Sequence, residues 1–201
     1  MSARRERILD AARGLIVREG YVSVSMHAIA RAAGVTRPAL YAEFGDRDDL
    51  FAALLDREEA RVLEMAAAST PVIEPGTDPA GLVAEIGEAA VDIYLDLVLS
   101  APETWQLVLM PGDGLPASAH ERVERGRTEI RQRTESMIAM AAGLRDVEVD
   151  AELLSHAVIS VSETAARLVL AEGGVERREA LSQSLRWLSR RVFSAATASG
   201  K

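Results

Sequence analysis

Three side chains that can donate hydrogen bonds lie close together near the N-terminus. They are Thr36, Arg37 and Tyr41, within "GVTRPALYAEFGDRDDL" at residues 34–50. A hydroxyl, a guanidinium and a phenol suit the binding of anionic or carbonyl acceptors. Pro38 is harmless early in a helix, because amides of the first turn have no helical acceptor. The segment therefore predicts a short helix whose outward side binds a partner.

Residue types that support catalysis or metal binding are scarce. The chain has no cysteine and three histidines. "HERVE" begins like a zinc-protease helix, but Glu124 stands where the second histidine is needed. "GDG" at residues 112–114 lacks the lysine and following glycine of a phosphate loop, and no nucleophile–base pair is visible. We therefore expect no enzyme, no metal and no cofactor.

Composition indicates a globular chain. Of 201 residues, 48% are hydrophobic and 27% are charged, which is too apolar for a disordered segment. No uncharged stretch approaches the roughly 18 residues that a membrane span needs, and charges interrupt the apolar positions of the first 20 residues. These features predict a cytoplasmic protein without a membrane partner.

Charge is divided unevenly along the chain. Residues 1–37 hold seven arginines against three carboxylates, a net charge of +4. Because the whole chain carries −8, residues 38–201 carry −12. A basic end on an acidic body suits a protein that places only that end on a polyanion, although ordinary fluctuation in charge placement is the alternative.

Apolar spacing is helical almost throughout, and no strand is expected, so the fold class is all-α. "STPVIEPGTDPAG" at residues 69–81 is the clearest break. Ser25 or Ser23, Thr36 and Asp46 are expected to cap helices, and Gly34 to end one in a left-handed conformation. Nine helices are expected. The first ends near Gly20, and the other eight cover residues 26–33, 37–44, 47–68, 79–100, 102–110, 117–142, 150–172 and 177–196.

The second and third helices are joined by a tight "AAGVT" turn, which is a helix-turn-helix pattern. "RILDAARGLIVREGYVSVSMHAIARAAGVTRPALYAEFGDRDDLFAALL" closely resembles the N-terminal DNA-binding domain of TetR-family transcriptional regulators, over roughly residues 4–55. Val24 replaces a frequent threonine, and "FGDRDDL" replaces a common F-x-S-K-E-x-L pattern. Asp46 can still cap, and Arg47 can still hold a phosphate.

On the third helix, Leu40 and Phe44 share one stripe, and Pro38 and Ala42 lie about 200° round on the other side. That small face can approach the floor of a major groove, where Arg37 would pair with guanine. The resemblance implies phosphate contacts for Thr36 and Tyr41. The full predicted DNA-binding set is Ser25, His27, Thr36, Arg37, Pro38, Ala39, Tyr41 and Arg47.

Apolar residues recur at intervals of three and four on the last two helices, as in helix bundles. The sequence does not separate packing within one chain from packing between two chains. The resemblance implies a dimer interface there. The predicted set is Leu154, Val158, Val161, Ala165, Leu168, Leu181, Leu185, Leu188 and Val192.

The resemblance also implies a pocket for a small-molecule effector among the fifth to eighth helices, although packing in the core is the more common role for each single candidate residue. Glu163 lies opposite the eighth-helix seam, where a solvated stripe with a Glu163–Arg167 pair is the alternative. The predicted pocket set is Tyr94, Trp105, Leu109, Met110, Met137, Met140 and Glu163.

Together these features predict a DNA-binding domain at residues 1–48 and a helical ligand-binding and dimerisation domain at residues 49–201. The predicted function is a homodimeric repressor on double-stranded DNA with a palindromic operator, released by an effector that the sequence does not identify. A ligand-independent regulator or an activator of the same family is the alternative. The sequence specifies neither the operator nor the regulated genes.

Overall fold

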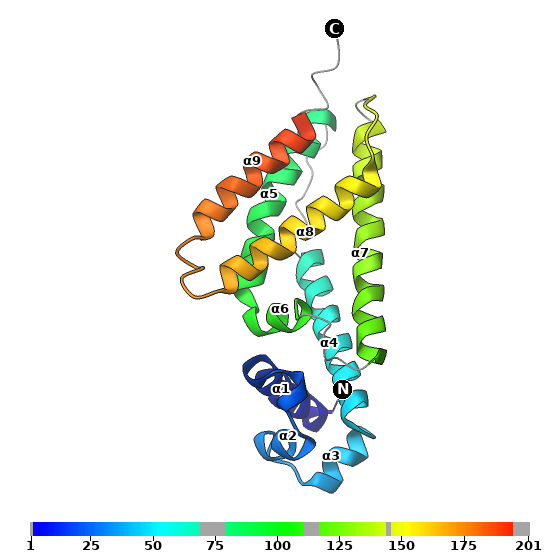
Figure 1. Ribbon diagram of the computed structural model, residues 1–201, viewed down its shortest axis with the longest axis vertical. Coiled ribbons are helices and arrows are strands. Elements are labelled where there is room, and N and C mark those ends of the chain that lie inside the picture. The colour runs from blue at the N-terminus through cyan, green and yellow to red at the C-terminus, as the bar shows by residue number, and fades with distance from the viewer. Residues whose placement is uncertain (1, 69–78, 111–116, 144–145, 195–201) are drawn as a thin grey trace. The chain divides into compact units, whose positions relative to one another are not determined.

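The computed structural model describes residues 2–68, 79–110, 117–143 and 146–194, with side chains at 66–68, 79–88, 117–119 and 191–194 left aside. Within these ranges the backbone is all-α, as predicted (Figure 1). Its helices are α1 (Ala3–Glu19), α2 (Met26–Ala32), α3 (Arg37–Glu43), α4 (Arg47–Ala68), α5 (Pro79–Ser100), α6 (Pro102–Val108), α7 (Ala117–Gly143), α8 (Ala151–Leu170) and α9 (Arg178–Ser194), with a 3₁₀ turn, η1, at Tyr21–Ser23.

Side-chain caps fix where the short helices begin. The Ser25 hydroxyl accepts from the Ala28 amide at 3.1 Å, and the Thr36 hydroxyl accepts from the Ala39 amide at 3.3 Å. Asp46 accepts from the Asp49 amide at 2.8 Å, ahead of α4. Each bond satisfies an amide that has no helical acceptor. The three predicted caps are therefore confirmed.

The chain forms two compact units that are not contiguous in sequence. Unit 1 contains α1 to α3, most of α4, α6 and the start of α7, whereas unit 2 contains α5, α8, α9 and the rest of α7. The predicted division at residue 48 concerns function and remains a prediction. By packing, unit 1 extends further, because side chains of α4 and α6 complete its core. That core includes Ile8, Leu9, Ile16, Ile29, Leu40, Leu50, Phe51, Leu54 and Leu107.

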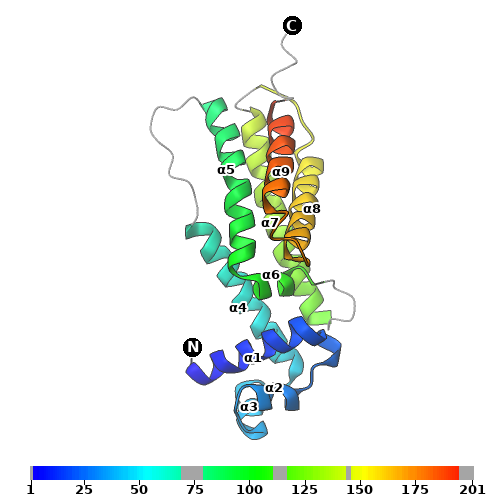
Figure 2. The same cartoon turned by 90° about the vertical axis from the view of Figure 1, so that its left-hand side faces the viewer.

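In unit 2, α9 lies along α5, and α8 also packs on α5 (Figures 1 and 2). Polar side chains join α5 to α9: Asp92 accepts from the Ser182 hydroxyl at 2.6 Å, and Arg178 donates to Asp96 at 2.8 Å. Arg186 also pairs with Asp92. Asp92 and Asp96 of α5 therefore face arginines of α9.

Of the described helices, α8 is long and apolar enough to cross a membrane by length and composition alone. Only 22% of its apolar window is buried inside the chain. Core helices of other proteins pass the same test, so the finding is weak evidence for a span. Two large apolar side chains of α8, Leu153 and Val158, are exposed within a single chain.

Candidate nucleic-acid interface

The turn between α2 and α3 has the tight geometry that the sequence predicted. Gly34 has φ +64°, a left-handed conformation that costs glycine little. The Val35 amide donates to the Ala30 carbonyl at 3.0 Å and closes the end of α2. The turn therefore fixes how α3 leaves α2.

The two sides of α3 differ as expected. Leu40 is fully buried and Phe44 is 3% exposed, so this stripe belongs to the core of unit 1. Pro38 and Ala42 are exposed on the other side, and Arg37 and Tyr41 are exposed at the edges of that face. The predicted buried and exposed faces of the helix are therefore confirmed. The large side chains of Leu40 and Phe44 pack in the core, and the opposite face carries small side chains.

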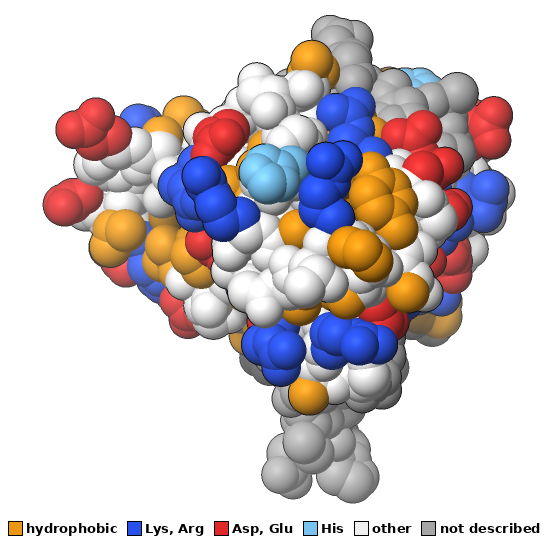
Figure 3. Space-filling model, turned by 90° about the horizontal axis from the view of Figure 1, so that it is seen from below, with side chains coloured by type: hydrophobic (Ala, Val, Ile, Leu, Met, Phe, Trp, Pro, Cys, Tyr) orange, Lys and Arg blue, Asp and Glu red, His pale blue; other side chains and the backbone are white. Residues whose placement is uncertain are grey.

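The predicted DNA contacts come from the start of α2 and from α3. His27, Arg37, Pro38 and Tyr41 are exposed, whereas Ala39 is half-buried. Figure 3 looks at this end of unit 1 and shows arginine side chains and a histidine across it, with acidic side chains mostly toward the margins. The surface combines positive charge with small apolar side chains.

The two capping hydroxyls keep a free donor. Ser25 and Thr36 are exposed, and each uses its oxygen as the acceptor for a helix amide. A hydroxyl that accepts one bond can still donate its own proton. Both can therefore cap a helix and donate to a phosphate oxygen at the same time.

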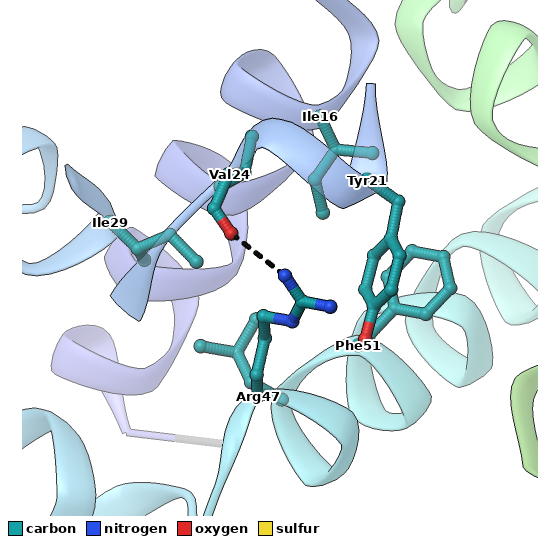
Figure 4. Close-up of a pocket in the computed structure, with 7 residues that line it drawn as sticks. Ile16, Tyr21, Val24, Ile29, Arg47 and Phe51 are labelled. Carbon is teal, nitrogen blue, oxygen red and sulfur yellow. Dashed lines mark hydrogen bonds between the residues drawn. The ribbon is translucent and has the colours of Figure 1, made fainter. Parts of the chain in front are cut away.

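Arg47 is held inside unit 1 rather than pointing freely outward. Its guanidinium donates to the Val24 carbonyl at 3.3 Å and lies 4.3 Å from the centre of the Tyr21 ring (Figure 4). The Tyr21 hydroxyl donates to Asp48 at 2.6 Å, and burial together with that carboxylate raises the pKa of Tyr21 to about 12. A shallow apolar depression adjoins the guanidinium, lined by Ile16, Tyr21, Val24, Ile29, Arg47, Leu50 and Phe51.

This geometry gives Arg47 a structural task, because the Val24 carbonyl directly precedes the cap of α2. A guanidinium has five donors, so the contacts described leave others for a phosphate. The predicted phosphate contact of Arg47 therefore stays a prediction. The sequence did not predict the contact with Tyr21, because no sequence pattern links Arg47 to a tyrosine 26 positions earlier in the chain.

Several arginines of the basic segment are already paired. Arg4 contacts Glu43, and Arg13 contacts Glu58 and Glu103. Within residues 1–37, which the structure describes from residue 2, the exposed arginines that form no ion pair are Arg7, Arg18, Arg31 and Arg37. The net charge of residues 1–37 therefore overstates the positive charge that is available to bind a polyanion.

A buried carboxylate that the sequence analysis did not single out lies inside unit 1. Glu58 on α4 is 0% exposed and accepts from Arg57 Nη2 at 2.6 Å and from Arg61 Nη1 at 3.1 Å. Burial alone raises the pKa of Glu58, but hydrogen bonds from Thr104 and Arg57 outweigh it and hold the pKa below its ordinary value. Helical spacing places Glu58 on α4 but does not identify partners on α6.

The residues predicted to line an effector pocket divide between the units. Trp105, Leu109 and Met110 belong to unit 1, and the first two are buried there. Tyr94 belongs to unit 2, where its hydroxyl donates to the Ser162 carbonyl at 2.9 Å. The other three also lie in unit 2, namely Met137, Met140 and Glu163.

Met137 and Met140 are 62% and 63% exposed on α7, so they are open to solvent within one chain. Glu163 forms the expected pair with Arg167 at 3.2 Å. That pair agrees with the alternative interpretation of this face of α8 as a solvated polar stripe. The pocket set remains a prediction.

The residues predicted for a dimer interface differ in burial. Ala165 is 4% exposed and belongs to the core of its own chain, whereas Val158 and Leu188 are each 36% exposed. Leu154, Val161, Leu168, Leu181 and Leu185 are half-buried, and the Val192 side chain lies outside the described residues. Leu153 at 63% and Trp187 at 60% add apolar surface that the predicted set missed.

Residues 8–54 match the family described as "Bacterial regulatory proteins, tetR family". The chain is 43% identical over 61 residues to the HTH-type transcriptional regulator AcrR of Shigella flexneri, covering 30% of this chain and 28% of AcrR. It is 33% identical over 67 residues to the HTH-type transcriptional repressor AcnR of Corynebacterium diphtheriae, covering 33% and 35%. The chain thus spans about a third of the length of these relatives.

Among solved structures, a TetR-like transcriptional regulator from Rhodococcus sp. RHA1 is similar over 95% of this chain and 96% of its own. The TM-score is 0.71 and the sequence identity 27%. The similarity therefore extends beyond the helix-turn-helix segment to both units.

Proposed function

Because the chain belongs to the TetR family of transcriptional regulators, we propose that it binds a palindromic operator in double-stranded DNA as a homodimer and represses transcription. The family is one of regulators and not of enzymes, and this chain is not an enzyme. Action on the chromosome places the protein in the cytoplasm.

The observation that carries the proposal is the outward face of α3. A buried Leu40–Phe44 stripe and the Thr36 cap hold this helix so that Arg37, Pro38 and Tyr41 face outward. Arg37 would donate to guanine O6 and N7, and Pro38 and Ala39 would contact thymine methyl groups. Ser25, His27, Thr36, Tyr41 and Arg47 would contact phosphates and fix the register.

Two features support a homodimer: the spacing of the two half-sites in a palindromic operator and the exposed apolar residues of unit 2. Two recognition helices must reach half-sites roughly 34–36 Å apart. Exposed apolar residues on α8 and α9, including Leu153, Val158, Trp187 and Leu188, would be covered by a second copy. This role matches the low burial of α8 within one chain.

The repressor assignment rests on the name of a relative, AcnR, which is a transcriptional repressor. Release by a small-molecule effector bound within residues 49–201 completes the proposal. The finer roles are tested separately, because an activator or a ligand-independent regulator would use the same DNA-binding surface.

The experiment is selection from a random DNA duplex pool by the full chain, followed by fluorescence-anisotropy titration of the enriched duplex and a scrambled duplex. We expect an enriched palindrome, tighter binding to it, and affinity that falls as salt rises. No enrichment of any sequence would overturn the proposal. A thermal-shift and DNA-release screen with small molecules then tests the effector, and persistent silence would favour a ligand-independent regulator.

A further inference from the structure

The first turn of α1 grips the last turn of α3. Arg4 donates from Nε and Nη2 to the same Glu43 carboxylate oxygen, at 2.8 and 2.7 Å. Arg5 donates to the Glu43 backbone carbonyl at 3.2 Å, and its guanidinium carbon lies 4.3 Å from the centre of the Phe44 ring. Two adjacent arginines thus hold the end of α3 by its side chain, its backbone and the residue that follows it.

This grip adds a hold on the last turn of α3 to those that the Thr36 cap and the buried Leu40 provide earlier in the helix. The helix has seven residues, and Leu40 is its only buried one. Carbonyls in the last turn of a helix have no helical donor, and that end carries partial negative charge. Arg5 supplies both a donor and a positive charge there, from a helix that Ile8 and Leu9 anchor in the core.

Two of the charges involved, those of Arg4 and Glu43, neutralise each other. Glu43 has a side chain that is 17% exposed and is neutralised by Arg4, whose own side chain is 52% exposed. An unpaired carboxylate at this end of α3 would repel phosphates. The Arg4–Glu43 pair removes that repulsion, and the same pair fixes the end of the helix.

We propose that Arg5, together with the Arg4–Glu43 pair, positions α3 for sequence recognition by setting the pose in which its outward face meets the bases. These residues act through α3 and not as phosphate contacts. The inference rests on the proposed DNA-binding function. It assigns a specificity role to Arg4 and Arg5, which lie on α1, outside the helix-turn-helix.

Because Arg4 and Glu43 carry opposite charges, their substitution distinguishes an electrostatic effect on DNA binding from an effect on the position of α3. Replacing Arg4 removes a positive charge, and replacing Glu43 removes a negative one. If the residues acted only by electrostatics, Arg4→Gln would weaken binding to every DNA and Glu43→Gln would strengthen it. If they position α3, both substitutions lower the ratio of affinities for selected and scrambled duplexes.

The experiment measures that ratio by fluorescence anisotropy for the full chain carrying Arg4→Gln, Glu43→Gln, both together, or Arg5→Met. The selected duplex is the one enriched by the unaltered protein. We expect each single variant to lower the ratio about three- to tenfold, the size expected for a lost hydrogen bond. The double variant restores the net charge and should fall no further than the worse single variant, because the two residues act as a pair.

Arg7→Met is the matched control, since Arg7 lies in the same part of α1 and is exposed. It reports what the loss of one positive charge does to both duplexes. Thermal unfolding of every variant, and the salt slope on the scrambled duplex, complete the measurement. A positioning residue leaves that slope unchanged, whereas a lost phosphate contact reduces it by about 0.9.

A ratio that stays constant in Glu43→Gln and Arg5→Met would overturn the inference and leave the proposed function intact. An equal loss on both duplexes with a reduced salt slope would also overturn it, by making Arg5 a phosphate contact. If the unaltered protein enriches no sequence, the proposed function fails and this inference fails with it.

Discussion

The hydroxyl of Thr104 on α6 donates a 2.5 Å hydrogen bond to the carboxylate of Glu58, which is fully buried on α4. The same carboxylate accepts from Arg57, which is itself 7% exposed. One buried negative charge thus joins α4 to α6 inside unit 1. The stability of unit 1 therefore depends on a buried group that is not among the residues predicted to contact DNA.

Glu58→Gln is expected to destabilise unit 1, because it removes the closest anion of the buried Arg57 guanidinium and leaves only the more exposed Glu6 and Asp10 paired with it. Removing one partner of a buried pair costs on the order of 3 kcal/mol in the free energy of unfolding. Urea unfolding followed by circular dichroism measures it. Thr104→Val is the matched comparison, and the loss of one hydrogen bond should cost about 1 kcal/mol. Equal stability of Glu58→Gln and the unaltered chain would contradict this account.

Stability should also fall in acid through the same residue. The folded pKa of Glu58 is lowered, while the unfolded value is about 4.3. Ionised Glu58 therefore stabilises the fold fully above the unfolded pKa, and this contribution is lost as pH falls through the folded pKa. Melting temperatures across the acid range should show the gap between the unaltered chain and Glu58→Gln narrowing below about pH 4. A gap that widens in acid would show the sign to be wrong.

Arg37→Ala and Tyr41→Phe should affect DNA binding differently. Loss of a bidentate guanine contact costs about 1–3 kcal/mol of discrimination, so Arg37→Ala should relax sequence preference at one position. Loss of a phosphate contact has no sequence dependence, so Tyr41→Phe should weaken binding to selected and scrambled duplexes about equally. Anisotropy titrations on both duplexes compare them, and the reverse pattern would exchange the assigned roles.

Leu188→Glu is expected to shift the protein from dimer to monomer. A charge at an apolar position that a second copy covers would be buried without a partner. Sedimentation velocity measures the oligomeric state. Ile130→Glu, on α7 and 49% exposed, is the control outside the predicted interface and should leave the dimer in place. A dimer that survives Leu188→Glu but not Ile130→Glu would move the interface to α7.

Gly174→Ala should destabilise unit 2 because a methyl group has no room there. A Cβ at this position would lie 2.4 Å from the backbone carbonyl oxygens of Leu168 and Val169, and backbone cannot rotate away as a side chain can. Overpacking of this kind costs about 1–3 kcal/mol. Thermal unfolding compares it with Gly143→Ala, where the added group meets nothing within 4 Å. Equal melting temperatures would show that the turn yields.

Local rules were enough to predict the helices and their caps. A cap and the amide it binds are three residues apart, as for Thr36 and Ala39, so the sequence window that specifies the helix start also contains the partner. The division of α3 into a buried and an exposed side follows from helical periodicity alone. The outward set on α3 was therefore predicted from the sequence, and a resemblance assigned it to DNA.

Only the tertiary structure determined which charged side chains are paired with distant parts of the chain. Arg5 and Glu43 are 38 positions apart, and Glu58 and Thr104 are 46 apart, so no local window contains either pair. The same limit applies to burial: apolar spacing placed Ala165 and Val158 on one seam, yet one is in the core and the other is 36% exposed. Spacing specifies the face of a helix, whereas the neighbour that covers that face depends on how distant helices pack.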